Sequence, residues 1–139
     1  MKTGLSNRLT WAEHTVYRLY DNQQRLIYVG CANDLIKRLR THQKTAWWYP
    51  QIERIQTEIH QGRNAALHAE AKIRDTEHPR WNIEARWMKR DSWNRQMFAD
   101  YITALENHQS SKYASIKRRI ETARKEYHER YGTNQQQAA

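Results

Sequence analysis

The chain of 139 residues has room for one small domain with a short appendage, which excludes two independent enzyme domains. Its mean hydropathy of −1.12, without an apolar run near the ~18 residues of a membrane helix, excludes a membrane-spanning protein. The 24 Lys and Arg against 15 Asp and Glu leave a net charge of +9, which favours nucleic acid as a partner ahead of an anionic membrane. A basic surface without a specific partner is the alternative.

Cysteine and histidine usage argues against a structural metal. Cys31 is the single cysteine, which excludes an intramolecular disulfide, and the seven histidines have no zinc-finger spacing. We interpret Cys31 as a small loop residue rather than a reactive thiol. Residues 1–11 contain no apolar stretch followed by a small-residue cleavage site, so we expect no signal peptide and a cytoplasmic protein.

The first predicted elements are two strands. β-branched and aromatic runs at Thr15–Tyr20 and Leu26–Gly30 are separated by a short polar segment, Asp21–Arg25, which is typical of a hairpin. A helix then follows to about Gln43, with Asn33 as its cap and Asp34 as a favourable acid in its first turn. Its expected apolar side consists of Leu35, Ile36 and Leu39, and the segment Trp47-Trp48-Tyr49-Pro50 ends it.

A third strand and a second helix complete the predicted domain. The spacing of Ile52, Ile55, Thr57 and Ile59 predicts a strand that ends at His60. After the turn at Gly62, we expect Asn64 to cap a helix from Ala65 to about Thr76, which His78-Pro79 ends.

This order of elements predicts an α+β fold with a small three-stranded antiparallel sheet flanked by helices. We divide the chain into a lead-in (1–13), this domain (14–83) and a basic helical extension (84–139). In the extension, Ser92 is the expected cap of a helix carrying Trp93, Met97, Tyr101, Ile102 and Leu105. Ser110-Ser111 would start another, with one apolar stripe: Tyr113, Ile116, Ile120, Ala123 and Tyr127. The stripe is interpreted as core, or as a contact with a second copy or a partner protein.

Glu70 is unusual because it lies in the middle of the apolar stripe of the second helix. Ala66 and Ile73 flank it on one side, and Leu67 and Ala71 on the other. A carboxylate turned toward a core costs several kcal/mol unless it is paired, so we expect a partner, either an arginine or a metal ion.

Three further positions suggest a site. Arg38 and His42 lie one turn apart on the border of the first helix, where solvated side chains are the commoner explanation. Tyr17 and Tyr28 are strand residues, for which cross-strand packing is the ordinary role. Gly30 closes a strand, which indicates that another backbone or a ligand phosphate comes close there.

At these residues the sequence resembles the GIY-YIG nuclease family. Thr15-Val16-Tyr17 stands at the first name-giving triplet, with Thr15 in place of its glycine, and Tyr28-Val29-Gly30 stands at the second. The run from Tyr28 to His42 resembles the family signature nearly throughout. Glu70 falls at the metal-binding glutamate, and His78-Pro79-Arg80-Trp81-Asn82 resembles the ending of the excision-repair branch.

The resemblance implies a DNA endonuclease with one Mg²⁺ or Mn²⁺. In this comparison, Glu70 would hold the ion, Arg38 would clamp the scissile phosphate and Tyr17 would be the general base. Tyr28 and His42 would position the water or relay the proton, while Gly30 and Asn82 would have structural roles. The alternatives are an inactive DNA-binding module that keeps the fold and a subunit of a larger complex.

The remaining cations and tryptophans are candidate DNA contacts. Trp47 and Trp48 would either stack on bases or cover the sheet, and covering is favoured. The expected phosphate contacts are Arg40, Lys44, Lys117, Arg118, Arg119 and Arg124, for which a solvated face is the alternative.

Overall fold

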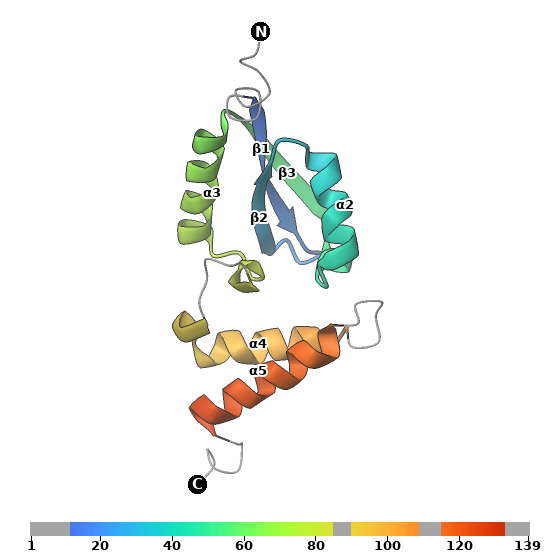
Figure 1. The fold of residues 1–139 in the computed structure, drawn as a ribbon, viewed down its shortest axis with the longest axis vertical. Coiled ribbons are helices and arrows are strands. Elements are labelled where there is room, and N and C mark those ends of the chain that lie inside the picture. The colour runs from blue at the N-terminus through green and yellow to red at the C-terminus, as the bar shows by residue number, and fades with distance from the viewer. Residues whose placement is uncertain (1–11, 85–89, 109–114, 133–139) are drawn as a thin grey trace, which may run out of the picture. The chain divides into compact units, whose positions relative to one another are not determined.

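The structure, a computed structural model, describes residues 12–84, 90–108 and 115–132. The chain divides into two compact units, Met1–Ala85 and Arg86–Ala139. The elements of the first unit are β1 (Glu13–Tyr20), β2 (Leu26–Ala32), α2 (Leu35–Thr45), η1 (Tyr49–Gln51), β3 (Arg54–Gln61), α3 (Arg63–Glu77) and η2 (Asn82–Glu84), where η marks a 3-10 helix (Figure 1).

The three strands form one antiparallel sheet in the order β2-β1-β3. β1 and β2 are the predicted hairpin, and β1 pairs on its other side with β3, so that Tyr17 lies between Gly30 and Thr57. This confirms the predicted α+β class. Thr15 pairs with Ala32 and Ile59 in regular register, so its side chain is accommodated in a strand without a glycine.

The two helices of this unit cover opposite faces of the sheet (Figure 1). Side chains alternate along a strand, so Val16 and Tyr17 point to different faces. On one face Val16 and Val29 pack with Ala66 and Ile73 of α3 in a buried cluster. On the other face Tyr17 contacts α2. β1 therefore faces a separate helix on each side.

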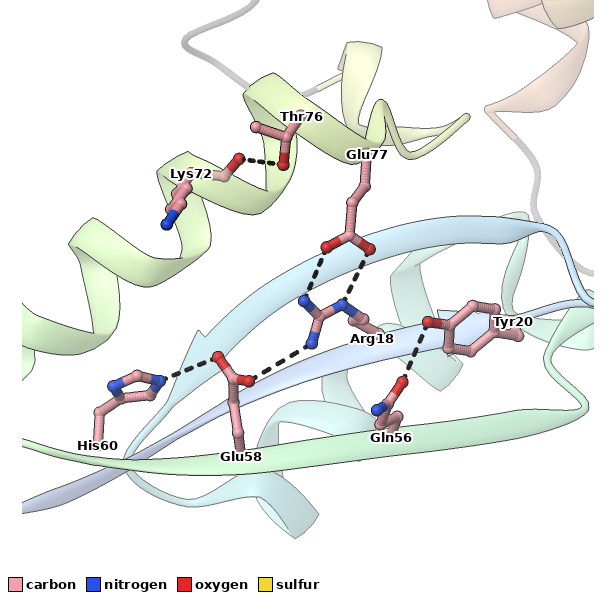
Figure 2. A network of polar contacts seen from close by, with 8 residues as sticks. All are labelled: Arg18, Tyr20, Gln56, Glu58, His60, Lys72, Thr76 and Glu77. Atoms are coloured by element: carbon pink, nitrogen blue, oxygen red, sulfur yellow. Dashed lines mark hydrogen bonds and ion pairs between the residues drawn. The ribbon is translucent and has the colours of Figure 1, made fainter.

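A polar network fastens α3 to the sheet near its C-terminal end (Figure 2). Arg18 of β1 donates two hydrogen bonds to Glu77, of 3.1 and 2.8 Å, and forms a 3.5 Å ion pair with Glu58 of β3. His60 lies 3.0 Å from the same Glu58 carboxylate. Bidentate arginine pairs fix orientation as well as distance. This network therefore helps to set the position of α3, and with it the position of Glu70.

The outer edge of β2 is occupied along only part of its length. The backbone N–H groups of Arg80 and Trp81 donate to the carbonyls of Leu26 and Ile27, at 3.1 and 2.8 Å. One step further, the Asn82 side chain accepts from Val29 N–H and donates to Val29 C=O, both at 2.9 Å. The carboxamide thus supplies the pair of hydrogen bonds that a neighbouring strand would supply.

Several local expectations need correction. The cap of α2 is Asp34, whose carboxylate accepts from Lys37 N–H, and Asn33 lies outside the helix. Ile36, expected on the apolar side of α2, is 60% exposed, whereas His42 is the buried residue of that helix. α3 begins two residues early because Gly62, with φ of 90°, takes the cap position instead of Asn64.

The two tryptophans after α2 belong to the core, so the packing interpretation is correct and base stacking is not. Trp47 and Trp48 are 1% and 4% exposed. Trp48 stacks on Tyr28 with ring centroids 4.6 Å apart, and Trp47 lies 5.0 Å from Trp81. These rings cover the sheet beside α2 and leave no face for a base.

The second unit contains η3 (Arg90–Ser92), α4 (Arg95–Glu106) and α5 (Ile116–Tyr131), and the two helices contact each other. The apolar stripe is confirmed as core at Ile116, Ile120 and Ala123, which are buried, whereas Tyr127 is half-buried. α4 buries Phe98, Tyr101 and Leu105. Ser110, Ser111 and Tyr113 lie outside the described residues.

The start of α4 differs from the prediction. Its cap is Asn94, which accepts from Met97 N–H, and Ser92 belongs to the preceding 3-10 helix. Trp93 precedes the helix and packs against Phe98 and Tyr101, with centroids 4.7 and 5.2 Å away. Along the parts of the chain that are described, no helix has the length and apolar character needed to cross a membrane.

Candidate active site

A cavity of about 420 Å³ opens beside the uncovered end of β2. It joins side chains from both faces of the sheet across the small residues that end this strand. Its walls are formed by His14, Tyr17, Tyr28, Gly30, Cys31, Ala32, Asn33, Arg38, Arg63, Leu67 and Glu70. Four of the five predicted catalytic residues, Tyr17, Tyr28, Arg38 and Glu70, therefore share one space, although they come from β1, β2, α2 and α3.

His42, the fifth predicted catalytic residue, lies behind the cavity wall. Its Nε2 is 2.8 Å from the Tyr17 hydroxyl in a buried hydrogen bond. The imidazole is enclosed by the rings of Tyr28 and Trp48, each with its centroid 5.0 Å away. Burial, with the nearby charge of Arg38, lowers its pKa to about 4. The His42 ring is therefore neutral near pH 7.

Gly30 is explained by the phenol of Tyr17. A Cβ at this position would lie 2.5 Å from the Tyr17 hydroxyl oxygen and 3.0 Å from Tyr28 Cε1. No backbone or ligand is needed to account for the glycine, which corrects the expectation from the sequence. The missing side chain lets two tyrosine rings from neighbouring strands lie side by side, with centroids 6.2 Å apart.

Arg38 is the cation beside both phenols. Burial raises the pKa of Tyr17 above its usual range, and the neighbouring Tyr28 adds to this increase, whereas the Arg38 guanidinium opposes it. The pKa of Tyr28 is also raised by burial and again opposed by Arg38. Both phenols are therefore protonated at neutral pH, and an exposed guanidinium remains at the cavity wall.

Glu70 has an arginine partner, one of the two partners that we expected from the sequence. Its side chain is 14% exposed, and its Oε1 lies 3.3 Å from an Nη of Arg74, one turn further along α3. The salt bridge does not fill the cavity, since Glu70 also lines it. Cys31 lies in β2 and not in a loop. Burial and the Glu70 carboxylate raise the pKa of its thiol to about 12, so it stays protonated.

Sequence reasoning missed several wall residues. His14 is 6% exposed, and its Nδ1 is 2.8 Å from the carbonyl of Ala12. Arg63 and Leu67 precede Glu70 by seven and three residues on α3, so they lie on the same side of the helix. That spacing was present in the sequence. It would have identified both positions once Glu70 was assigned to a site.

The two predicted phosphate contacts of the first unit, Arg40 and Lys44, are not wall residues of the cavity. Arg40 and Lys44 are exposed on α2, and Lys117 and Arg118 are exposed on α5, while Arg119 is half-buried. Arg124, whose side chain is also exposed, forms an ion pair with Glu106 within the second unit. Contact of these six residues with DNA stays a prediction.

Residues 13–83, about half of the chain, match the family model of the UvrC-like GIY-YIG domain. The UvrABC system protein C of Pasteurella multocida is 43% identical over 75 residues, which is 49% of this chain and 12% of that protein. The protein of the same name from Desulfotalea psychrophila is 37% identical over 76 residues, again 49% and 12%. This chain thus corresponds to only a small part of these relatives. It belongs to the GIY-YIG nuclease family.

Proposed function

We propose that the chain is a metal-dependent DNA endonuclease that hydrolyses phosphodiester bonds in the cavity beside β2. The observation that carries this proposal is the meeting of Tyr17, Tyr28, Arg38 and Glu70 around one space. Phosphodiester hydrolysis needs an activated water, neutralised charge on the phosphate and help for the leaving oxygen. Phenols, a guanidinium and a carboxylate provide groups for these tasks.

Arg38 would bind the scissile phosphate. Its guanidinium is exposed at the cavity wall, and its rigid fork of donors fits two phosphate oxygens at once. Its charge also lies next to both phenols, as their pKa shifts indicate. One cation would thus hold the substrate and favour loss of a proton from Tyr17.

The pair of Tyr17 and His42 would remove the proton from water. We assign the hydrogen bond between them as Tyr17 O–H donating to Nε2 of a neutral imidazole. When the phenol oxygen accepts a proton from water, its own proton can pass to Nε2 over 2.8 Å. His42 would then be a positioning and relay residue, since it does not line the cavity.

Glu70 is the residue that would hold one Mg²⁺ or Mn²⁺. The residues fit such an ion, because hard cations with few protein ligands take a carboxylate, waters and phosphate oxygens, and the cavity has room for them. When bound, the ion would supply charge neutralisation at the phosphate. Arg74 competes for the same carboxylate, at 3.3 Å.

A plasmid-nicking assay tests the proposal. Glu70→Ala should abolish nicking under Mg²⁺ and Mn²⁺ while leaving the protein folded. Asp75→Ala is the matched control, because it removes an exposed carboxylate from the same helix outside the cavity. Cleavage by Glu70→Ala at the unmodified rate would refute the assignment.

The alternative is an inactive module or a subunit of a larger complex. It is compatible with an alignment that covers only 12% of the length of each relative. It predicts salt-sensitive DNA binding by the unmodified protein without any product under either metal ion. The same assay, with binding measured beside it, separates the two functions.

A further inference from the structure

One side of α3 lines the cavity along two full turns. Arg63, Leu67 and Glu70 have the spacing i, i+4 and i+7, and all three are wall residues. The Glu70 side chain is only 14% exposed, whereas Leu67 and Arg63, nearer the start of the helix, are exposed residues. The carboxylate is therefore deep, and the arginine stands at the rim.

Among the described residues, Arg63 is a cation that forms neither an ion pair nor a side-chain hydrogen bond. The other arginines near this helix have an ion-pair partner, since Arg18 pairs with Glu77 and Arg74 with Glu70. Arg63 is also the first residue of α3, directly after the cap Gly62, so the positive end of a 15-residue helix adds to its charge. Such a position attracts an anion.

The order of side-chain types along this side of α3 matches the order of groups along a nucleotide strand. A carboxylate suited to an ion at one phosphate is followed by an apolar side chain and then by a cation. The two ends are seven residues apart, about 10 Å along the helix axis at ~1.5 Å per residue. One DNA strand advances about 3.4 Å per nucleotide along a duplex. A second phosphate of the same strand would therefore lie near Arg63.

We propose that Arg63 binds a neighbouring phosphate of the cleaved strand, within about three nucleotides of the scissile one. Leu67 then contacts the sugar between the two. This inference rests on the proposed function for its substrate, and it makes Arg63 a positioning residue. Arg38 holds the reacting phosphate, and Arg63 fixes where along the strand that phosphate falls.

The test compares Arg63→Gln with Lys72→Gln. Lys72 is an exposed cation of the same helix that does not line the cavity, so its loss changes the net charge equally (Figure 2). Binding to a duplex oligonucleotide is measured in EDTA across salt concentrations. We expect Arg63→Gln to weaken binding about tenfold and to reduce the slope of log K against log salt by ~0.9, or ~0.7 for single strands. Arg63→Lys should restore most of the slope.

Two further measurements locate the contact. With neutral methylphosphonates placed singly along the strand, the unmodified protein should show weakened binding at a position beside the scissile phosphate, and Arg63→Gln should lose sensitivity there alone. In nicking assays, Arg63→Gln should raise KM about tenfold with kcat within about threefold. Thermal unfolding of each variant checks that the fold is kept.

The outcomes separate this inference from the nuclease proposal. Equal slopes for Arg63→Gln and Lys72→Gln would overturn the role of Arg63 even if plasmid DNA is nicked. A fall in kcat with unchanged KM would also overturn it, because the residue would then act in the chemical step. Binding with the expected slopes but without cleavage would refute the nuclease and leave Arg63 as a phosphate contact. If the unmodified protein binds no DNA, both proposals fail.

Discussion

The hydroxyl of Tyr17 on β1 and Nε2 of His42 on α2 lie 2.8 Å apart, and both residues are buried. The tyrosine reaches the histidine only because Gly30 has no side chain beneath its ring. One contact thus joins the sheet to α2 and places a proton acceptor behind the phenol that lines the cavity. It links the stability of the fold to the proposed chemistry.

Tyr17→Phe should lower both stability and activity. The substitution leaves the buried Nε2 of His42 without its partner, which costs about 1–3 kcal/mol in the free energy of unfolding. Loss of the proposed base should slow nicking by about 10² to 10⁴. Tyr20→Phe is the control, since that hydroxyl donates to Gln56 at an exposed site. Denaturant unfolding and plasmid nicking measure the two effects. Nicking by Tyr17→Phe at the normal rate would eliminate Tyr17 as the base.

His42 should make stability depend on pH. Its pKa is lowered from an ordinary 6.5 to about 4 by burial, so the unfolded chain binds a proton that the folded chain does not between these values. The contribution of neutral His42 to the free energy of unfolding is fully present above pH 6.5. It is lost as the pH decreases to about 4, by on the order of 3 kcal/mol. Urea unfolding from pH 4 to 7 measures the slope. His42→Gln, which cannot titrate, should have a shallower slope, and equal slopes would contradict this account.

Gly30→Ala should displace the Tyr17 ring. An added Cβ would lie 2.5 Å from the hydroxyl oxygen, and overpacking of this kind costs about 1–3 kcal/mol. The cost should become smaller when Tyr17→Ala has already removed the ring, and the remaining obstacle is then the 3.0 Å approach to Tyr28 Cε1. A double-mutant cycle measured by chemical unfolding gives this coupling. Additive effects of the two substitutions would show that the ring is not the obstacle.

Asn82→Asp should be a destabilising change. The carboxamide accepts from Val29 N–H and donates to Val29 C=O, both at 2.9 Å and buried. An aspartate cannot donate when ionised, so the Val29 carbonyl loses its partner and faces a buried charge, at a cost of about 1–3 kcal/mol or more. Asn64→Asp on an exposed helix position should be nearly neutral by comparison. Calorimetry measures both, and equal melting temperatures would contradict the strand-like role of Asn82.

Arg74→Gln should strengthen the response to metal ions. The guanidinium lies 3.3 Å from the Glu70 carboxylate and competes with any cation there. The repulsion between this guanidinium and a bound cation amounts to a few kcal/mol at most near a surface. Without it, we expect the Mg²⁺ concentration for half-maximal nicking to fall several-fold. Lys72→Gln again controls for net charge. An unchanged or higher Mg²⁺ requirement would argue against Glu70 as the ligand.

The local elements and the unusual position of Glu70 were predictable from the sequence alone. Runs of β-branched and aromatic residues predicted β1 and β2, and the placement of a carboxylate within an apolar stripe singled out Glu70 on α3. These features depend on neighbours within one or two turns of the same segment. The resemblance of several spaced motifs to those of the GIY-YIG family then indicated the family, because each motif contains the residue types that the family has at that place.

Only the tertiary structure decided which side of each element is covered. His42 and Ile36 both belong to α2, yet the histidine is buried under aromatic rings and the isoleucine is 60% exposed. Residue types alone would suggest the reverse. Likewise, Asn82 completes the edge of β2 through contacts with Val29, and Arg63 lines the cavity together with residues far away in the sequence. The periodicity of apolar residues indicates which residues share one face of a helix or strand. It does not indicate which element packs on that face, because the packing of the whole sheet determines this.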